Sequence, residues 1–262
     1  MSFLPAPLEP VRPALLTRLS PTTRLVVGTA WLAVAVIAAG PRVSFALSLV
    51  AVVLLVIASG LPLERVPTRL APLWLAALGL GLLTVLVNPS NGDPTVVALV
   101  RAGPLRVTGP ALEAGIAIAL RLVVIALVSL LVFATSDPTR LADALVQQWR
   151  VPYRFAYGTL AALRIVPLLA ADWAAITAVH RLRGLQRRSP WGRAAEIGGS
   201  LLVLLVSAIR RAERMALAMD ARGFDTGRPR GVYRPVALRA LDAAALVVGL
   251  AIAVAALVLA AI

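Results

Sequence analysis

The pattern of apolar and polar positions divides the chain into long hydrophobic runs separated by polar segments. A helix needs about 20 apolar residues to cross the core of a bilayer. With their flanking residues, five runs approach that length: Leu25–Ala39, Val43–Gly60, Leu73–Val87, Pro110–Thr135 and Val236–Ile262. We therefore predict an all-α membrane protein with about five transmembrane helices, four within residues 25–135 and one within residues 236–262.

The polar segments predict turns and loops. Residues 1–24 are interrupted by prolines and predict a polar N-terminal arm rather than a cleavable signal peptide. Gly40-Pro41-Arg42 predicts a tight turn, and Leu61–Pro72 a short charged loop. Asn88–Thr108 contains Asn, Gly, Asp and Pro, which favour an irregular loop.

Residues 136–235 form a long, arginine-rich segment that still contains much Leu, Ala and Val. Ser136-Asp137-Pro138 predicts a helix start, because Ser or Asp can cap a helix and Pro suits its first turn. Helical patterns follow over Tyr153–Val166, Leu168–Arg183 and Ala194–Arg222. Pro167 is expected to kink or end the first of them. We expect a region of about three helices here.

The last of these helical patterns has one apolar face. Its members recur at alternating steps of four and three residues: Leu201, Leu205, Ala208, Ala212, Met215 and Met219. Arg210, Arg211 and Arg214 occupy other positions. A stripe opposed by arginines indicates a helix that lies against protein, partly at the membrane surface, and does not cross the bilayer along its whole length.

Charge changes the picture, because the formal net charge is +14 and all 26 basic residues are Arg. Seventeen of the 26 fall between Arg140 and Arg239. With five spans, the N-terminal arm and residues 136–235 share one side, which the positive-inside rule makes cytoplasmic. The C-terminus is then outside. Aromatic residues do not interleave with the arginines, so we expect no nucleic-acid partner.

The composition excludes several kinds of chemistry on this chain. There is no Cys, and the absence of Lys excludes a P-loop lysine and a Schiff base. His180 is the only His, so a metal site with two His ligands cannot form. Seven carboxylates lie among the arginines: Asp137, Asp143, Asp172, Glu196, Glu213, Asp220 and Asp225. Ion pairs explain them better than an enzyme site does, and we expect no catalytic, cofactor-binding or metal-binding residues.

Arg121 lies inside an apolar run, where an ionisable side chain usually faces protein or water. It could line a substrate path. We favour a structural role, in which Arg121 pairs with a buried partner such as Glu113 or Asp242, or extends to the membrane interface.

Two Arg-Gly pairs, Arg183-Gly184 and Arg222-Gly223, end arginine-rich helical segments 39 residues apart. Each could be an ordinary helix end, because Arg suits the negative end of the helix dipole and Gly adopts the left-handed conformation at C′. Two such ends on one side also favour a docking function. A planar guanidinium at a helix tip suits bidentate pairing with carboxylates of a partner.

At these residues the chain resembles the transmembrane T component of energy-coupling factor transporters, a family that includes CbiQ-, BioN- and EcfT-like permeases. That family has two Ala-Arg-Gly motifs at the tips of long coupling helices. Ala221, Arg222 and Gly223 match the second motif fully. Arg183 and Gly184 match the first, but Leu182 stands where the family usually has Ala.

The resemblance covers nearly the whole chain. Further matching segments are Leu19–Arg24, Gly103–Thr108, Leu120–Leu122, Thr135–Pro138 and, after Pro152, Leu163–Leu169. Each segment is short, and it is their order and spacing that make the match specific.

The resemblance implies a bacterial inner-membrane scaffold that is not itself an enzyme. Two ATP-binding-cassette subunits, or a homodimer of one, would hold ATP and Mg²⁺ and bind the coupling motifs at Arg183, Gly184, Ala221, Arg222 and Gly223. A separate small membrane subunit would bind the substrate, a vitamin or a transition-metal ion. Residues 136–235 would be the cytoplasmic coupling region.

Two other classes of protein stay open. One is a solitary permease or membrane scaffold that works without ATPases. The other is a membrane-embedded enzyme that uses the carboxylates of residues 136–235 on a lipid or nucleotide. The first predicts no ATPase partner, and the second requires a localised pair of acids in a cleft.

Overall fold

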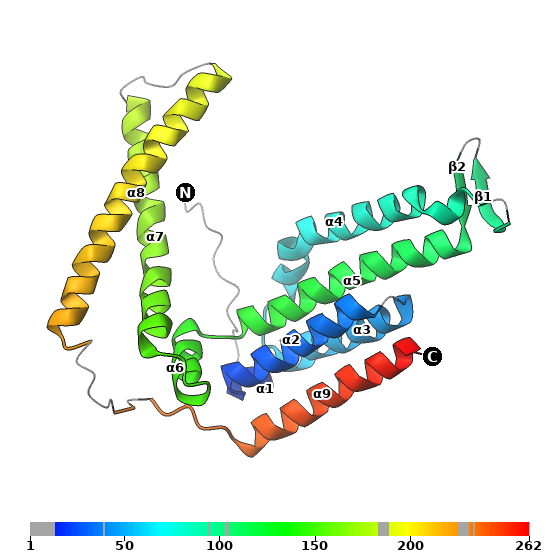
Figure 1. Cartoon of the computed structure of the whole chain (residues 1–262), viewed down its shortest axis with the longest axis horizontal. Coiled ribbons are helices and arrows are strands. Elements are labelled where there is room, and N and C mark those ends of the chain that lie inside the picture. Colours follow the sequence, from blue (N-terminus) through cyan, green and yellow to red (C-terminus); the bar gives the residue numbers. More distant parts are fainter. Residues whose placement is uncertain are drawn as a thin grey trace. The chain divides into compact units, whose positions relative to one another are not determined.

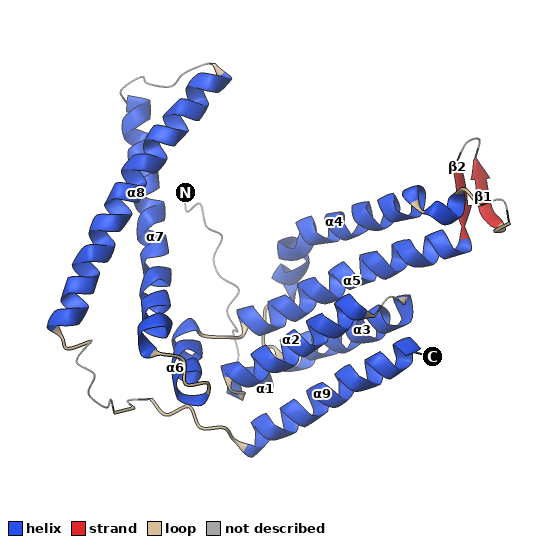
Figure 2. Ribbon diagram, viewed as in Figure 1, coloured by secondary structure: helices blue, strands red, loops and turns tan. Residues whose placement is uncertain are grey.

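The computed structural model of the chain is almost entirely helical (Figures 1 and 2). It describes residues 14–38, 40–93, 95–102, 105–182, 189–224, 231–232 and 234–261. The helices are α1 (Leu15–Arg18), α2 (Pro21–Ile37), α3 (Pro41–Ala58), α4 (Val66–Val87), α5 (Gly109–Ala134), α6 (Pro138–Gln148), α7 (Tyr153–Leu182), α8 (Pro190–Ala221) and α9 (Ala240–Ala261). Two short 3₁₀ turns, η1 (Leu63–Arg65) and η2 (Pro89–Asn91), flank α4.

The five predicted apolar runs lie largely within α2, α3, α4, α5 and α9. Six of the described helices are long and apolar enough to cross a membrane, namely α3, α4, α5, α7, α8 and α9, and α2 is apolar but shorter. The prediction of an all-α membrane protein is confirmed. Length and composition alone do not separate α7 and α8 from the other long helices.

The chain divides into two compact units. One unit spans residues 145–235 and contains α7 and α8, which lie against each other and cross (Figure 1). The other unit, here called the membrane bundle, contains α1 to α5 and α9, from residues 6–144 and 236–262. The boundary between the units falls within α6.

In the membrane bundle, α5 packs against α2, α3 and α4, and α9 packs against α2 and α3. The most deeply buried side chains include Val43, Leu47 and Val124. The starts of α2, α4 and α9 and the ends of α3 and α5 share one end of the bundle, the proximal end. The connection from α4 to α5 lies at the other, distal end (Figure 1).

Small residues allow the bundle helices to approach closely. A Cβ placed on Gly115 of α5 would lie 2.7 Å from the carbonyl oxygen of Gly81 in α4. A Cβ on Gly28 of α2 would lie 2.4 Å from Cγ2 of Val132 in α5. Such contacts are typical of membrane helices, whose association depends on close backbone packing because lipid is as apolar as the helix surfaces.

The N-terminal boundaries of two spans were predicted too late. Pro21–Arg24 were placed in the polar arm, but they form the first turn of α2 and are buried. Leu61–Pro72 was predicted to be a loop, but α4 begins at Val66 and contains Pro72. Pro21 interferes little at the first position of α2, because the first backbone N–H groups have no partner within the helix. Pro72 lies inside α4 and removes one backbone hydrogen bond, which the helix tolerates.

The predicted irregular loop before α5 contains a short antiparallel hairpin. Strand β1 (Ala98–Ala102) pairs with β2 (Leu105–Thr108), with Arg101 opposite Arg106. Asn91 ties the hairpin to α4, because its amide donates to the Val85 carbonyl at 2.6 Å and its side-chain oxygen accepts from the Thr108 backbone N–H at 3.1 Å. The hairpin thus stays close to the distal end of the bundle.

The described residues between α5 and α9 form three helices, α6, α7 and α8, but their limits differ from the prediction. The predicted helix start at Ser136-Asp137-Pro138 is confirmed: α6 begins at Pro138, and the Asp137 carboxylate accepts from the Thr139 backbone N–H at 2.9 Å. The prediction that Pro167 ends a helix is wrong: α7 runs from Tyr153 to Leu182 and contains Pro167. The last helix begins at Pro190, where proline suits the first turn.

Candidate functional site

The end of α8 is the clearest candidate site, because it contains the predicted Ala221-Arg222-Gly223 motif. Ala221 is the last residue of α8, and Gly223 has a φ of 75°. The Gly223 N–H donates to the Asp220 carbonyl at 2.8 Å, and the Phe224 N–H donates to the Met219 carbonyl at 3.0 Å. These two bonds form a Schellman motif, which satisfies carbonyls left open at a helix end.

The positive φ at position 223 favours glycine. A side chain at a left-handed position costs about 1–2 kcal/mol, and glycine avoids that cost. The turn leaves Arg222 exposed. Within the part of the chain that the structure describes, no ion pair involves its guanidinium. The motif therefore presents a cation on a well-defined backbone turn at the tip of a long helix.

Phe224, directly after the motif, connects this tip to the start of α7. Its ring meets the ring of Tyr153 edge to face, with centroids 5.4 Å apart and planes at 82°. Such aromatic pairs contribute about 0.5–1.5 kcal/mol beyond the area that they bury. Tyr153 is the first residue of α7, so the contact braces the end of one helix against the beginning of the other.

A groove of about 340 Å³ lies between α7 and α8 beside the tip. Ala212, Met215 and Met219 from the predicted apolar stripe line it, so this half of the stripe packs toward α7. Leu201 and Leu205, from the other half, are exposed. The stripe thus continues beyond the surface that α7 covers.

Farther along, an ion pair links the two helices. One carboxylate oxygen of Asp172 in α7 accepts from Arg211 of α8 at 2.9 Å and from the Ser207 hydroxyl at 3.2 Å. The sequence pattern predicted that Arg211 lies on the side of α8 opposite the apolar stripe. That prediction is wrong for Arg211, because its guanidinium contacts α7. Its long side chain reaches around α8 to the neighbouring helix.

A second polar contact joins the end of α7 to the first half of α8. His180 Nδ1 lies 3.5 Å from Glu196 Oε1 and 3.4 Å from the Ser200 hydroxyl. His180 precedes Arg183 and Gly184, the other predicted docking residues, and these two lie outside the described residues. The structure thus describes the helix end at Ala221, Arg222 and Gly223. The docking role of both motifs stays a prediction.

The carboxylates are also candidate metal ligands. Among the described residues there is no group of three or more His, Asp or Glu side chains able to hold a metal ion. Asp172 pairs with Arg211, Glu196 meets His180, and Asp137 caps α6. Asp225 lies outside the described residues.

Arg121 has a structural partner, but not one of the predicted ones. Its guanidinium donates to the carbonyl of Ala38 at 2.7 Å. Ala38 follows the last residue of α2, where carbonyl groups lack partners within the helix. The expected pairing with Glu113 or Asp242 is wrong, because Arg121 lies level with the end of α2.

Sequence reasoning missed a polar cluster at the proximal end of the bundle. Arg24 of α2 donates to the backbone carbonyl of Thr135, and to its hydroxyl at 2.8 Å. Asp242 of α9 accepts from the backbone N–H groups of Ser20 at 2.6 Å and Arg239 at 2.8 Å. Leu19–Arg24 and Thr135–Pro138 both resemble segments of the same family. That resemblance was the one feature of the sequence that pointed to these residues.

The chain was compared with known proteins. The model of the family described as cobalt transport protein, CbiQ, matches residues 14–233. The energy-coupling factor transporter transmembrane protein EcfT of Heliobacterium modesticaldum is 28% identical over 234 residues, which are 86% of this chain and 85% of that protein. EcfT of Limosilactobacillus fermentum is 29% identical over 244 residues, covering 90% and 89%.

EcfT of Leuconostoc gelidum subsp. gasicomitatum is 30% identical over 234 residues, which are 86% of this chain and 85% of the relative. These names describe membrane components of transporters rather than enzymes. The matches run from α1 to beyond α8, through both compact units. The chain therefore belongs to the CbiQ family, which includes EcfT-like transmembrane components of energy-coupling factor transporters.

Proposed function

We propose that this chain couples ATP hydrolysis on partner subunits to substrate uptake through a separate membrane subunit. The observation that carries the proposal is the tip of α8, where Arg222 is exposed on a turn that Gly223 permits and Phe224 braces. A cation presented on an ordered backbone suits a partner with an acidic groove, because only the Arg222 side chain would have to be ordered on binding.

The distribution of arginines supports a cytoplasmic location for this tip. At the proximal end of the bundle lie Arg18, Arg24, Arg69, Arg140 and Arg239, and residues 145–235 are joined to this end through α6. At the distal end lie Arg42, Arg101 and Arg106. By the positive-inside rule, the proximal end faces the cytoplasm, and the C-terminus after α9 lies outside.

Charges within α7 and α8 argue that this pair does not cross the bilayer. Asp172 lies near the middle of α7, and Arg210, Arg211 and Arg214 interrupt the second half of α8. Charged groups at the centre of a membrane helix are costly. We therefore interpret α7 and α8 as coupling helices at the cytoplasmic surface, and α2, α3, α4, α5 and α9 as the five spans.

The energy source lies on other chains. This chain has no Lys, so it cannot form a P-loop, and ATP with Mg²⁺ would bind to two ATP-binding-cassette subunits or a homodimer of one. Arg222 would pair with carboxylates on one ATPase subunit. Arg183, next to Gly184, would bind the other ATPase subunit in the same way. Closing the ATPase pair would then move both helix tips, and differential contacts in the two states would transmit the motion.

The substrate would be held elsewhere. A small membrane subunit packed on this scaffold would bind a vitamin or a transition-metal ion. The related proteins carry names for cobalt transport and for energy-coupling factor transport, which fit a scaffold common to several substrates. We propose that the substrate-binding partner, and not this chain, determines which substrate is transported.

A charge reversal at the tip tests the proposal. The chain would be co-expressed with the ATP-binding-cassette subunits of its own genome, solubilised in detergent and recovered by an affinity tag. We expect Arg222→Glu to abolish or strongly reduce ATPase recovery, while the amount of chain in the membrane stays unchanged. Arg214→Glu, an exposed arginine of α8 two turns from the tip, is the matched control and should retain the ATPases.

The double variant Arg183→Glu with Arg222→Glu extends the test to both motifs. Full ATPase recovery by this variant would overturn the proposal. Absence of any ATPase with the unaltered chain would instead favour a solitary permease or scaffold.

A further inference from the structure

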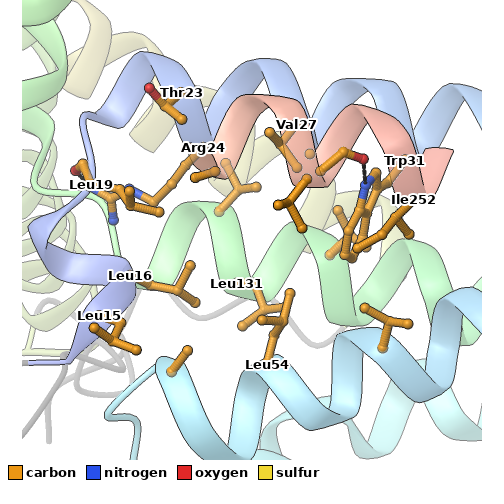
Figure 3. Close-up of a pocket in the computed structure, with 18 of the residues that line it drawn as sticks. Leu15, Leu16, Leu19, Thr23, Arg24, Val27, Trp31, Leu54, Leu131 and Ile252 are labelled. Carbon is orange, nitrogen blue, oxygen red and sulfur yellow. Dashed lines mark hydrogen bonds between the residues drawn. The ribbon is translucent and has the colours of Figure 1, made fainter. Parts of the chain in front are cut away.

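The membrane bundle contains an apolar cavity of about 390 Å³ that the proposed coupling function does not use. It runs along α2 and is walled by α1, α3, α5 and α9 (Figure 3). Leu16, Leu54, Leu131 and Ile252 are among the side chains that line it. A volume of this size is within the range of ligand sites in proteins and far exceeds an ordinary packing defect.

One wall of the cavity is exposed on the surface of the bundle. Leu241 and Val248 of α9 line it and are exposed, as is Leu15 of α1. Val248 lies two turns along α9 from Leu241, so its exposed surface is at the depth of lipid chains if α9 spans the membrane. An apolar space bordered in this way is accessible to acyl chains rather than to water.

One end of the cavity holds a buried cation. Arg24 lines the cavity near Leu19, and only 6% of its surface is exposed. Its guanidinium donates to the carbonyls of Thr135 and Leu19 and to the Thr135 hydroxyl, all of which are neutral. Its Nε is buried and has no hydrogen-bond partner.

No carboxylate of the described residues forms an ion pair with Arg24. The nearby Asp242 accepts backbone N–H groups of Ser20 and Arg239 with its two oxygens. Burial and the neighbouring Arg140 disfavour the charge of Arg24, and Asp242 offsets this only in part. An anion close to Arg24 would therefore be favourable. Arg18, exposed at the end of α1, adds a second cation at this end of the cavity.

The polar and apolar ends of the cavity are separated along the axis of α2. Arg24 is in the first turn of α2, where a spanning helix leaves the headgroup region. Trp31 lines the other end and donates from Nε1 to the Gly249 carbonyl at 2.8 Å (Figure 3). Seven residues of helix separate Arg24 from Trp31, which is about 10 Å along the axis.

We propose that this cavity binds an anionic phospholipid, with one acyl chain along α2 toward Trp31 and the phosphate group near Arg24 and Arg18. Basic pockets between membrane helices on the cytoplasmic side are suited to such headgroups. The site lies within the membrane bundle and does not depend on the ATPase contacts proposed above.

Quenching of Trp31 by brominated lipid tests the proposal. Trp74, Trp149, Trp173 and Trp191 would be replaced by Phe in the full-length chain, which leaves Trp31 as the only fluorophore of its kind. The chain would be reconstituted in phosphatidylcholine with increasing fractions of phosphatidylglycerol or phosphatidylcholine brominated in mid-chain. Since only 3% of Trp31 is exposed, lipid around the outside of the bundle should quench it weakly.

We expect brominated phosphatidylglycerol to quench Trp31 several-fold more effectively than brominated phosphatidylcholine and to saturate at a low fraction. Arg24→Gln should remove this preference. Ala245→Phe, which fills the cavity from α9, should remove the quenching itself. Ala255→Phe, on an exposed part of α9 that does not line the cavity, should behave like the parent.

Equal quenching by the two lipids would show a crevice without selectivity for anions and would overturn the proposal. Absence of quenching by either lipid would show that protein closes the cavity, and would also overturn it. Because Arg24→Gln also removes hydrogen bonds to Thr135, Ala245→Phe provides an independent test in a bundle whose polar cluster is intact.

Discussion

The membrane bundle and the α7–α8 pair are built from similarly apolar helices but are held together in different ways. Within α3 alone, five apolar residues are buried: Val43, Leu47, Ala51, Leu55 and Ala58. The described apolar residues that are buried in α7 and α8 are only Ala156 and Ile165. The bundle thus has a core, while α7 and α8 make a few discrete contacts with each other.

The difference suits the two proposed roles. A bundle with close backbone contacts resists deformation, because moving one helix disturbs packing along its whole length. The pair α7–α8 joins through the Asp172–Arg211 ion pair, the His180–Glu196 contact and the Tyr153–Phe224 rings. Its exposed surface, with Leu201 and Leu205, is available to partner subunits.

The largest stability effect is expected at the proximal polar cluster. Asp242→Ala removes two hydrogen bonds from a carboxylate to backbone N–H groups and leaves buried donors without partners. We expect the free energy of unfolding to fall by about 3 kcal/mol. The apparent melting temperature in detergent would measure it. Glu213→Ala, at an exposed position of α8, should shift stability by less than about 0.5 kcal/mol. Equal losses of stability in Asp242→Ala and Glu213→Ala would contradict the inference that the membrane bundle has a core and that α7 and α8 do not.

The close approach of α4 and α5 gives the next largest effect. In Gly115→Ala, the new methyl group would meet the Gly81 carbonyl and Val85, and backbone cannot yield as a flexible side chain can. We expect a loss of about 2 kcal/mol from overpacking. Gly79→Ala in α4 is the control, because a Cβ there meets nothing within 4 Å. A neutral Gly115→Ala, measured by the same melting assay, would show that the two helices are not tightly packed.

In α8, by contrast, we expect a glycine-to-alanine substitution to increase stability. A Cβ on Gly198 of α8 meets nothing within 4 Å, and alanine is the better helix former. Gly198→Ala should stabilise α8 by about 1 kcal/mol. Slower hydrogen exchange of α8 amides, with unchanged exchange in α5, would reveal it. Faster exchange in α8 would indicate that the glycine serves a contact with another part of the chain or a partner.

The smallest effect is expected at the ion pair between α7 and α8. Asp172 and Arg211 are both partly exposed, with side-chain exposures of 31% and 25%. A double-mutant cycle with Asp172→Asn and Arg211→Gln should give a coupling energy of about 0.5 kcal/mol, because solvent screens such pairs. A coupling energy of several kcal/mol would mean that this contact is as buried as those of the bundle, and that the two units are held together in the same way.

The spans and the site were predictable to different extents. Long apolar runs located α2, α3, α4, α5 and α9, because the thickness of a bilayer sets a length that composition reveals. Helix limits near prolines were less accurate, as Pro72 and Pro167 show. Both lie inside helices, because packing and neighbouring hydrogen bonds can compensate for one missing donor. The hairpin of β1 and β2 was missed, because its strands are short and contain arginines.

At the candidate site, the Arg-Gly pattern predicted the helix end correctly at Gly223, because few residues other than glycine favour a left-handed turn. It could not reveal that Phe224 would meet Tyr153, since 71 positions separate them and their contact depends on how α7 and α8 cross. The contact of Arg211 with Asp172 was hidden for the same reason.

Local chemistry along this chain accounts for its helices, its arginine asymmetry and its glycine-ended tip, since each depends on neighbouring residues or on the bilayer. The partners of its buried polar groups depend on distant segments. Arg121 meets the end of α2, Arg24 meets Thr135, and Asp242 meets Ser20 across 222 positions. A buried polar group must find a partner somewhere, but packing of the helices determines which group comes within reach.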